Sequence, residues 1–125
     1  MKSDDFRGVA ESKDFSKVEE LFSPDVVFRS PAVFKPYTGL DALKVLLGAV
    51  AEVFEDFRYI DQVETGDTAV LVFEARVGER QLNGVDVLRF GEDGLIVEMM
   101  VMVRPLSGLN ALAEEMGRRL GVTSG

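Results

Sequence analysis

The sequence contains no cysteine and no histidine. Without cysteine the chain cannot form disulfides, hold an iron–sulfur cluster or use a thiol nucleophile. Without histidine it lacks the side chain that most often serves as a general base or a metal ligand near neutral pH. Any proton transfer must therefore use a carboxylate, a tyrosine, a lysine or water.

Positive charge is scarce, with 14 Lys and Arg against 22 Asp and Glu and a formal net charge of −8. Proteins hold nucleic acids and anionic membrane surfaces mainly through Lys and Arg. We therefore expect neither a nucleic-acid partner nor a membrane partner.

Long hydrophobic runs are also missing. The longest apolar stretch, Leu95–Val103, contains Glu98 and is too short to span a bilayer. Residues Met1–Asp5 show no apolar run of the kind that opens a signal peptide, so we expect a cytoplasmic protein. The chain also has no metal-ligand spacing, phosphate-binding glycine loop or Ser/His/Asp set, and we expect no metal and no cofactor.

The helical patterns lie mainly in the first half of the chain. A length of 125 residues predicts a single domain, 1–125. Apolar spacing predicts a short helix around Phe6 and a second over 15–22, which ends at Ser23-Pro24. The main amphipathic helix is predicted from Leu40 to Phe54, and a last one follows Pro105.

Strand patterns dominate the second half. Residues 25–30, 57–64, 68–77, 81–90 and 95–104 are predicted strands, and short glycine-bearing links join the last four as antiparallel hairpins. This order predicts an α+β fold in which a curved antiparallel sheet wraps over the N-terminal helices. The hollow at the open end of such a sheet is the expected ligand site.

Asp86 is the most informative polar residue. It shares strand parity with Leu88 and Phe90, so it points into the hollow if that face is the inner one. Burial would raise the pKa of its carboxyl, and a protonated aspartate can donate a hydrogen bond to a carbonyl or an oxyanion. The alternative is a structural aspartate that is paired with a hydroxyl or a water, or that faces solvent.

Other polar residues have weaker claims on the site. Arg104 ends the last strand and caps the pocket mouth, pairs with a neighbouring acid or packs on a dimer partner. Glu74 and Arg76 are interpreted as outward-facing, because Leu71, Phe73 and Ala75 make a better inner face. The two phenols, Tyr37 and Tyr59, either donate to a ligand or anchor the core edge. Met99, Met100, Met102 and Met116 either line an adaptable site or fill gaps in the core.

Several segments together resemble the nuclear transport factor 2-like superfamily, within it the SnoaL-like and ketosteroid-isomerase-like branch. They are Leu21–Phe28, Ser30-Pro31, Tyr37–Leu40 and Val85–Met99. The resemblance covers nearly the whole chain and implies a cone-shaped fold with an apolar pocket. It does not imply one activity, because the superfamily includes enzymes of several classes and non-catalytic binders.

The resemblance also implies roles for individual positions. The aspartate that donates to the steroid oxyanion in the isomerases falls on Asp86; a protonated aspartate of that enzyme is a standard example of such a donor. The isomerases' general-base aspartate falls on Ser30 and their catalytic tyrosine near Phe6. Neither serine nor phenylalanine shuttles a proton near neutral pH, so isomerisation by that mechanism is not expected.

Two hypotheses follow. The first is a SnoaL-like protein that binds a small apolar carbonyl compound, with Asp86 as the catalytic acid or hydrogen-bond donor of an isomerase or lyase. The second is a non-catalytic ligand-binding or scaffold domain. The predicted ligand-binding residues are Phe6, Phe28, Ser30, Phe54, Tyr59, Leu88, Phe90, Met99, Val101, Val103 and Arg104. Apolar residues on both strand parities also predict a homodimer through the outer sheet face.

Overall fold

The computed structural model describes residues 1–121. Four of its six strands follow one another directly in the sequence, as expected of an α+β fold. The helices are α1 (Asp4–Ser12), α2 (Leu40–Val53) and α3 (Leu106–Leu120), with a short 3₁₀ turn at Val18–Glu20. The strands are β1 (Phe22–Arg29), β2 (Tyr37–Thr38), β3 (Glu55–Thr65), β4 (Thr68–Val77), β5 (Arg80–Phe90) and β6 (Ile96–Arg104). The predicted fold class is confirmed.

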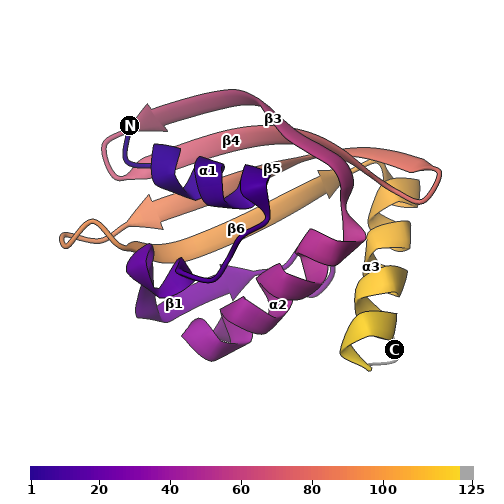
Figure 1. Cartoon of the computed structure of the whole chain (residues 1–125), viewed down its shortest axis with the longest axis horizontal. Helices are drawn as coiled ribbons and strands as arrows, with labels where there is room; N and C mark the ends of the chain where they lie inside the picture. Colours follow the sequence, from indigo (N-terminus) through magenta and orange to yellow (C-terminus); the bar gives the residue numbers. More distant parts are fainter. Residues whose placement is uncertain (122–125) are drawn as a thin grey trace.

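The six strands form one curved sheet in the order β2-β1-β6-β5-β4-β3 (Figure 1). Strands β3 to β6 make the antiparallel meander that the short glycine-bearing links predicted. One pairing differs from the expected all-antiparallel sheet, because β1 runs parallel to β6. The long stretch from β1 to β6, which includes α2, allows this parallel arrangement.

The helices lie on one side of the sheet (Figure 1). Helix α1 crosses in front of the long strands, α2 runs beside β1, and α3 stands at the end of β6. Helix α3 approaches β5 closely at Gly108, where an added Cβ would lie 2.8 Å from Cβ of Leu82. The three helices thus face the concave side of the sheet.

The second predicted helix, over 15–22, is wrong. Only Val18–Glu20 forms a 3₁₀ turn, and Phe22 already starts β1, where it pairs with Ile96. Pro24 therefore lies inside a strand rather than after a helix. The register of β1 against β6 shifts between Phe22 and Val27, and such an irregularity accommodates a proline, which has no N–H to donate.

Strict alternation in β4 sets the inner face of the sheet. Ala69, Leu71, Phe73, Ala75 and Val77 are all buried, and every residue between them is less so. The inner face predicted for β4 is thus the observed one.

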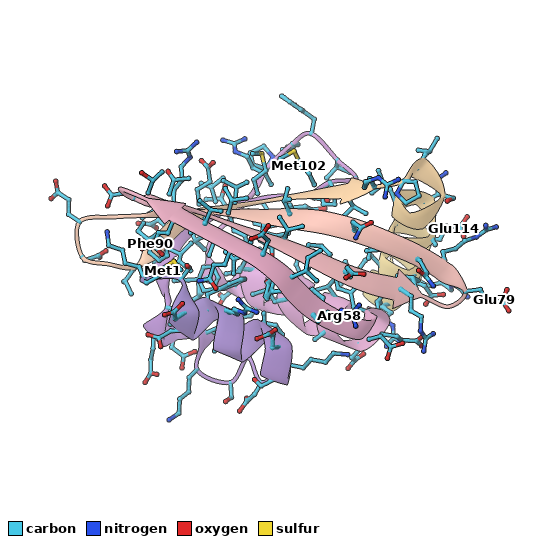
Figure 2. The ribbon with its side chains drawn as sticks, turned by 90° about the horizontal axis from the view of Figure 1, so that it is seen from above. Met1, Arg58, Glu79, Phe90, Met102 and Glu114 are labelled. Carbon is cyan, nitrogen blue, oxygen red and sulfur yellow. The ribbon has the colours of Figure 1, made fainter. Side chains whose placement is uncertain are left out.

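Figure 2 shows the other side of the sheet, where Met102 lies opposite α1 with no helix over it. Within residues 1–121, no helix is long and apolar enough to cross a membrane, and the cytoplasmic location stays a prediction.

Candidate functional site

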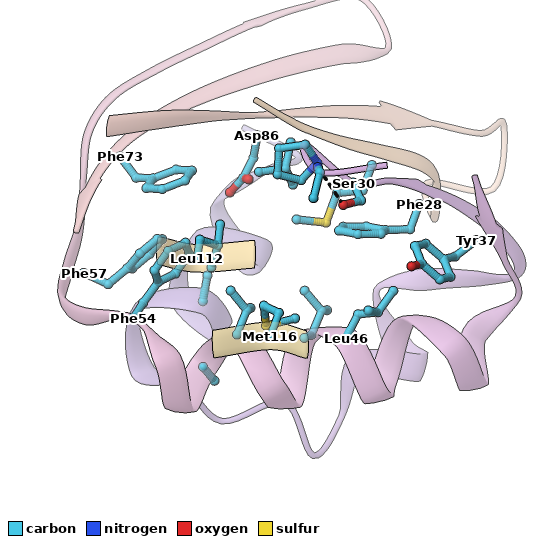
Figure 3. Close-up of a pocket in the computed structure, with 18 of the residues that line it drawn as sticks. Phe28, Ser30, Tyr37, Leu46, Phe54, Phe57, Phe73, Asp86, Leu112 and Met116 are labelled. Carbon is cyan, nitrogen blue, oxygen red and sulfur yellow. Dashed lines mark hydrogen bonds between the residues drawn. The ribbon is translucent and has the colours of Figure 1, made fainter. Parts of the chain in front are cut away.

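A cavity of about 490 Å³ lies between the helices and the concave face of the sheet (Figure 3). Its wall is mostly apolar and comes from α1, α2, α3, the β1–β2 segment and the inner faces of β3 to β6. Four side chains in the wall are titratable: Lys13, Tyr37, Tyr59 and Asp86. Among the described residues, Asp86 is thus the only carboxyl group that faces this space.

Asp86 reaches the cavity from the centre of the sheet. It lies in β5 opposite Leu71 of β4 and Val101 of β6, both of them buried. Asp86 is 4% exposed. This burial raises the pKa of the carboxyl from an ordinary 3.8 to about 7, because a carboxylate is poorly solvated there. The hydrogen bond from Tyr59 opposes that rise, since it stabilises the charged form.

Tyr59 is the partner of Asp86. Its phenol donates a hydrogen bond of 2.5 Å to Oδ2 of Asp86. Burial raises the pKa of Tyr59 strongly, and the nearby charge of Asp86 raises it further. The phenol therefore keeps its proton and remains a donor over the whole physiological range. The rings of Phe57 and Phe73 pack edge-on against Tyr59 and fix its orientation, with centroids 4.9 and 6.2 Å away.

Polar contacts from α1 hold the backbone of Tyr59. Arg7 donates to the carbonyl oxygen of Tyr59 at 3.3 Å and to the side chain of Gln62 at 2.9 Å. Glu11 accepts a hydrogen bond from the Tyr59 amide at 3.4 Å. Helix α1 thus fixes the position from which Tyr59 reaches Asp86.

Most of the predicted binding residues line this cavity. With Asp86, the sequence-based set that the structure brings together consists of Phe6, Phe28, Ser30, Phe54, Tyr59, Met99 and Val101. Ser30 Oγ accepts a hydrogen bond from the Ala32 amide and so shapes the turn after β1. Asp86 combines two of the interpretations considered for it, because it faces the cavity and is also paired with a hydroxyl.

Four predicted residues lie outside the cavity lining. Leu88 is fully buried and is the next inward-facing residue of β5 after Asp86. Phe90 lies further along, where the ammonium of Lys2 sits 5.9 Å from its ring. Parity placed both on the correct face, but it cannot tell which part of a long strand the cavity reaches.

The other two lie at the opposite end of the sheet. Val103 is opposite Gly84 and packs against the core. Arg104 is exposed, does not line the cavity and donates to the side-chain oxygen of Asn83 at 3.0 Å, so its partner is an amide and neither the pocket role nor the pairing with an acid is observed. The outward orientation predicted for Glu74 and Arg76 is observed, since each pairs across to β3, Glu74 with Arg58 and Arg76 with Glu55 and Asp56.

Sequence reasoning missed part of the wall. Phe57 and Phe73 join the predicted Phe54 in an aromatic cluster that closes one end, and Tyr37, whose role was left open, closes the other beside Phe28 (Figure 3). Phe57 was detectable, because it shares strand parity with Tyr59. One face each of α2 and α3 also lines the cavity. Its residues are Leu46, Leu47, Val50, Ala51, Leu112, Ala113, Met116, Gly117 and Leu120. Met99 and Met116 line it, whereas Met100 and Met102 do not.

In the part of the chain that the structure describes, no three His, Cys, Asp or Glu side chains come together as a metal site. The titratable groups of the cavity as described are thus one carboxyl group with a near-neutral pKa, the phenol of Tyr59 that holds it, the phenol of Tyr37 and the ammonium of Lys13, in a mostly apolar wall.

Comparison with known families decides the membership of the chain. The model of the SnoaL-like domain matches residues 4–99. The chain belongs to the SnoaL-like domain family. Its similarity to a steroid delta-isomerase from Pseudomonas aeruginosa is high, with 49% identity, a TM-score of 0.92, and coverage of 96% of this chain and 89% of that chain. The resemblance inferred from the sequence is thus confirmed.

Two further solved structures show the same architecture. A Silicibacter pomeroyi protein described as having a cystatin-like fold is 35% identical, with a TM-score of 0.88 and coverage of 92% of this chain and 82% of that chain. An NTF2-like protein of unknown function from Mesorhizobium loti is 23% identical, with a TM-score of 0.73 and coverage of 83% and 88%. No curated protein matches the chain.

Proposed function

We propose that this SnoaL-like protein binds a small apolar carbonyl compound in its cavity, with Asp86 as the hydrogen-bond donor to the carbonyl oxygen. The buried pair of Asp86 and Tyr59 in a mostly apolar wall is the observation that carries the proposal. Because Tyr59 donates to Oδ2, the proton of the neutral carboxyl sits on Oδ1, which is then free to donate to a ligand. A carbonyl oxygen is the acceptor that such a site prefers.

Donation from Asp86 has a chemical consequence. Negative charge develops on a carbonyl oxygen when a neighbouring C–H or C–C bond breaks, as it does in isomerases and lyases that act on carbonyl compounds. A hydrogen bond in a water-poor site stabilises that charge more than it stabilises the ground state. We therefore place the activity in this class, with Asp86 as the acid. The similarity to a steroid delta-isomerase supports the class.

The second candidate is a binder without turnover. Serine at position 30 and phenylalanine at position 6 favour it, because the wall described here then offers no second carboxyl group to accept the proton from carbon. If the protein is instead an enzyme, water or Asp86 itself has to accept the proton from carbon. The two candidates agree on binding and differ on proton transfer.

Acetylnaphthalene and the matched hydrocarbon ethylnaphthalene test both points. Fluorescence titration measures their affinities, and proton NMR in deuterium oxide measures exchange of the acetyl protons. We expect the ketone to bind more tightly than the hydrocarbon, and Asp86→Asn to change that preference. Exchange that the wild-type protein catalyses and D86N loses supports the enzyme. Asp86-dependent binding without exchange supports the binder, and equal affinity for both compounds would overturn the proposal.

We also propose a second copy of this chain as the partner of the outer sheet face. Outward-facing apolar residues lie in register across four strands there: Val63 opposite Val70, Val70 opposite Val87, and Val87 opposite Met100. A second row joins Val72, Val85 and Met102. An antiparallel sheet with a solvated face normally carries polar residues at such positions. A two-fold dimer would bury these rows against themselves.

A further inference from the structure

The wall that α1 contributes to the cavity carries a lysine where the helix pattern calls for an apolar side chain. Phe6 and Ala10 lie on the inward stripe of α1 and are 2% and 9% exposed. Lys13 follows three residues later as the C-cap of the helix, in the left-handed region with φ of 61°; the residue is exposed and its side chain lines the cavity. It is the only basic side chain in the wall as residues 1–121 define it.

The ammonium of Lys13 is held by a single hydrogen bond. Its Nζ donates to the backbone carbonyl of Phe54 at 2.7 Å, at the end of α2. An ammonium has three donors, so two N–H groups remain available. No carboxylate of the described chain lies within ion-pair distance of it, although Lys2, Lys44 and Arg119 each have one. The positive charge of Lys13 is therefore not neutralised by a neighbour.

The position of Phe54 places this charge relative to Asp86. Phe54 and Phe57 lie at one end of the cavity, Tyr37 at the other, and Asp86 between them (Figure 3). The ring of Phe54 lies 5.7 Å from that of Phe57, which lies 4.9 Å from the ring of Tyr59, the partner of Asp86. Aromatic rings thus line the wall between the residue that accepts from Lys13 and the residue that holds Asp86.

We propose that Lys13 binds an anionic group of the ligand, so that the natural ligand is an apolar carbonyl compound that also bears a carboxylate. The inference rests on the proposed function and narrows it to a substrate class. The net charge of −8 disfavours anions around the molecule as a whole, so selection of an anionic ligand requires a cation at the site. Lys13 provides one in a wall whose single carboxyl group is largely neutral below a pH of about 7.

Lys13 also has a purely structural interpretation. Lysine near the end of a helix stabilises its last carbonyls, and Nζ of Lys13 bonds such a carbonyl at the end of α2. A structural role predicts a loss of stability when the ammonium is removed, but no dependence of binding on the charge of the ligand. Ligand charge is therefore the variable that separates the two interpretations.

The test uses two biphenyl probes that carry an acetyl group at one end and either a carboxylate or a carboxamide at the other. Calorimetry measures both dissociation constants for the full chain and for Lys13→Met, which keeps most of the apolar stem and removes the charge. We expect the carboxylate to bind about three- to tenfold more tightly than the carboxamide to the wild-type protein. In K13M that ratio should fall to about one, while the affinity for the carboxamide changes little.

Lys17→Met is the matched control, because Lys17 is exposed like Lys13 but does not line the cavity. It should leave the ratio at the wild-type value. Equal affinity of the two probes for the wild-type protein, or an unchanged ratio in K13M, would overturn the role of Lys13 and leave the proposed function intact. Binding of neither probe would overturn both. Thermal unfolding of K13M gives its stability separately, so a loss of folded protein cannot be mistaken for a loss of charge recognition.

Discussion

The phenol of Tyr59 donates a hydrogen bond of 2.5 Å to Oδ2 of Asp86, and both residues are almost fully buried, at 5% and 4% exposure. One partner comes from β3 and the other from β5, with β4 between them. The hydrogen bond from Tyr59 thus fixes the orientation of the carboxyl group of Asp86, which faces the cavity. The protonation state of that acid decides what the cavity can do.

Removal of the phenol should raise the pKa of Asp86. The hydrogen bond from Tyr59 stabilises the carboxylate more than the neutral acid, so Tyr59→Phe destabilises the charged form more than the neutral form. From a starting value of about 7 we expect a rise of roughly 1 to 2, since a hydrogen bond to a charged group contributes about 1.5–3 kcal/mol. Carbon-13 NMR of the labelled carboxyl group measures this value directly.

Tyr37→Phe is the control for that titration, because Tyr37 lines the same cavity beside Phe28 rather than Asp86. It should leave the pKa of Asp86 where it is in the wild-type protein. A lower pKa in Y59F than in the wild-type protein would contradict the role of Tyr59 as a donor to the carboxylate.

Asp86 should also make stability depend on pH. Between 3.8, its pKa in the unfolded chain, and about 7, its pKa in the folded protein, the folded state binds a proton that the unfolded state has released. The free energy of unfolding therefore falls as pH rises through this window. From pH 5 to pH 7 the loss due to this group amounts to about 2–3 kcal/mol.

Asp86→Asn removes this dependence, since asparagine does not titrate. Urea unfolding of both proteins at pH 5 and pH 8 measures it, because the other acids titrate alike in both and cancel in the difference. We expect the stability of the wild-type protein relative to D86N to fall by about 2–3 kcal/mol between the two values. A difference that is constant with pH would show that Asp86 ionises normally.

Part of this site could be predicted from the sequence and part could not. Strand parity placed Asp86 on the inner face, because a strand alternates strictly and Leu88 and Phe90 mark that face. Parity does not show which residue on another strand lies opposite. Tyr59 reaches Asp86 only through the register of β3 on β4, which shifts between Tyr59 and Asp61, and no local pattern reveals such a shift.

The N-terminal error has a similar cause. Residues Phe15, Val18, Leu21 and Phe22 have helical spacing, but β6 offers an open edge on which the chain gains more by pairing. Phe22 joins that edge opposite Ile96, and the Ile96 amide donates to the Leu21 carbonyl at 2.8 Å. Partners this distant in the sequence are invisible to a local pattern, and tertiary pairing overrides the weak helical preference.

Phe73 and the backbone of β6 pack closely against Gly84, so we expect the shape of the cavity to depend on this glycine. A Cβ at this position would lie 2.7 Å from Cε2 of Phe73 and 2.8 Å from the carbonyl oxygen of Met102. Because Phe73 lines the cavity, Gly84→Ala must push its ring into that space or distort β6. We expect a loss of about 1–3 kcal/mol in stability together with weaker binding of the naphthalene probes.

Gly48→Ala is the matched control for Gly84. Gly48 is exposed in α2, and nothing lies within 4 Å of the position of its missing Cβ. Alanine there should leave binding unchanged and add up to about 1 kcal/mol of stability, because alanine favours the helix. Urea unfolding and probe titration of both variants measure the two effects. Equal behaviour of G84A and G48A would contradict the tight packing at Gly84.

The outer sheet face gives the last prediction. Val87 lies half-buried between Val70 and Met100 in the middle of the apolar row, so a lysine there would place an unpaired charge inside a dimer interface. We expect Val87→Lys to shift the dissociation constant of the dimer upward by at least about tenfold, since an unpaired interfacial charge costs several kcal/mol. Val45→Lys, on an exposed position of α2, adds the same charge away from that face and should leave the dimer intact. Sedimentation velocity over a concentration series measures both constants. A monomer mass for the wild-type protein at micromolar concentration would contradict the dimer directly, without any variant.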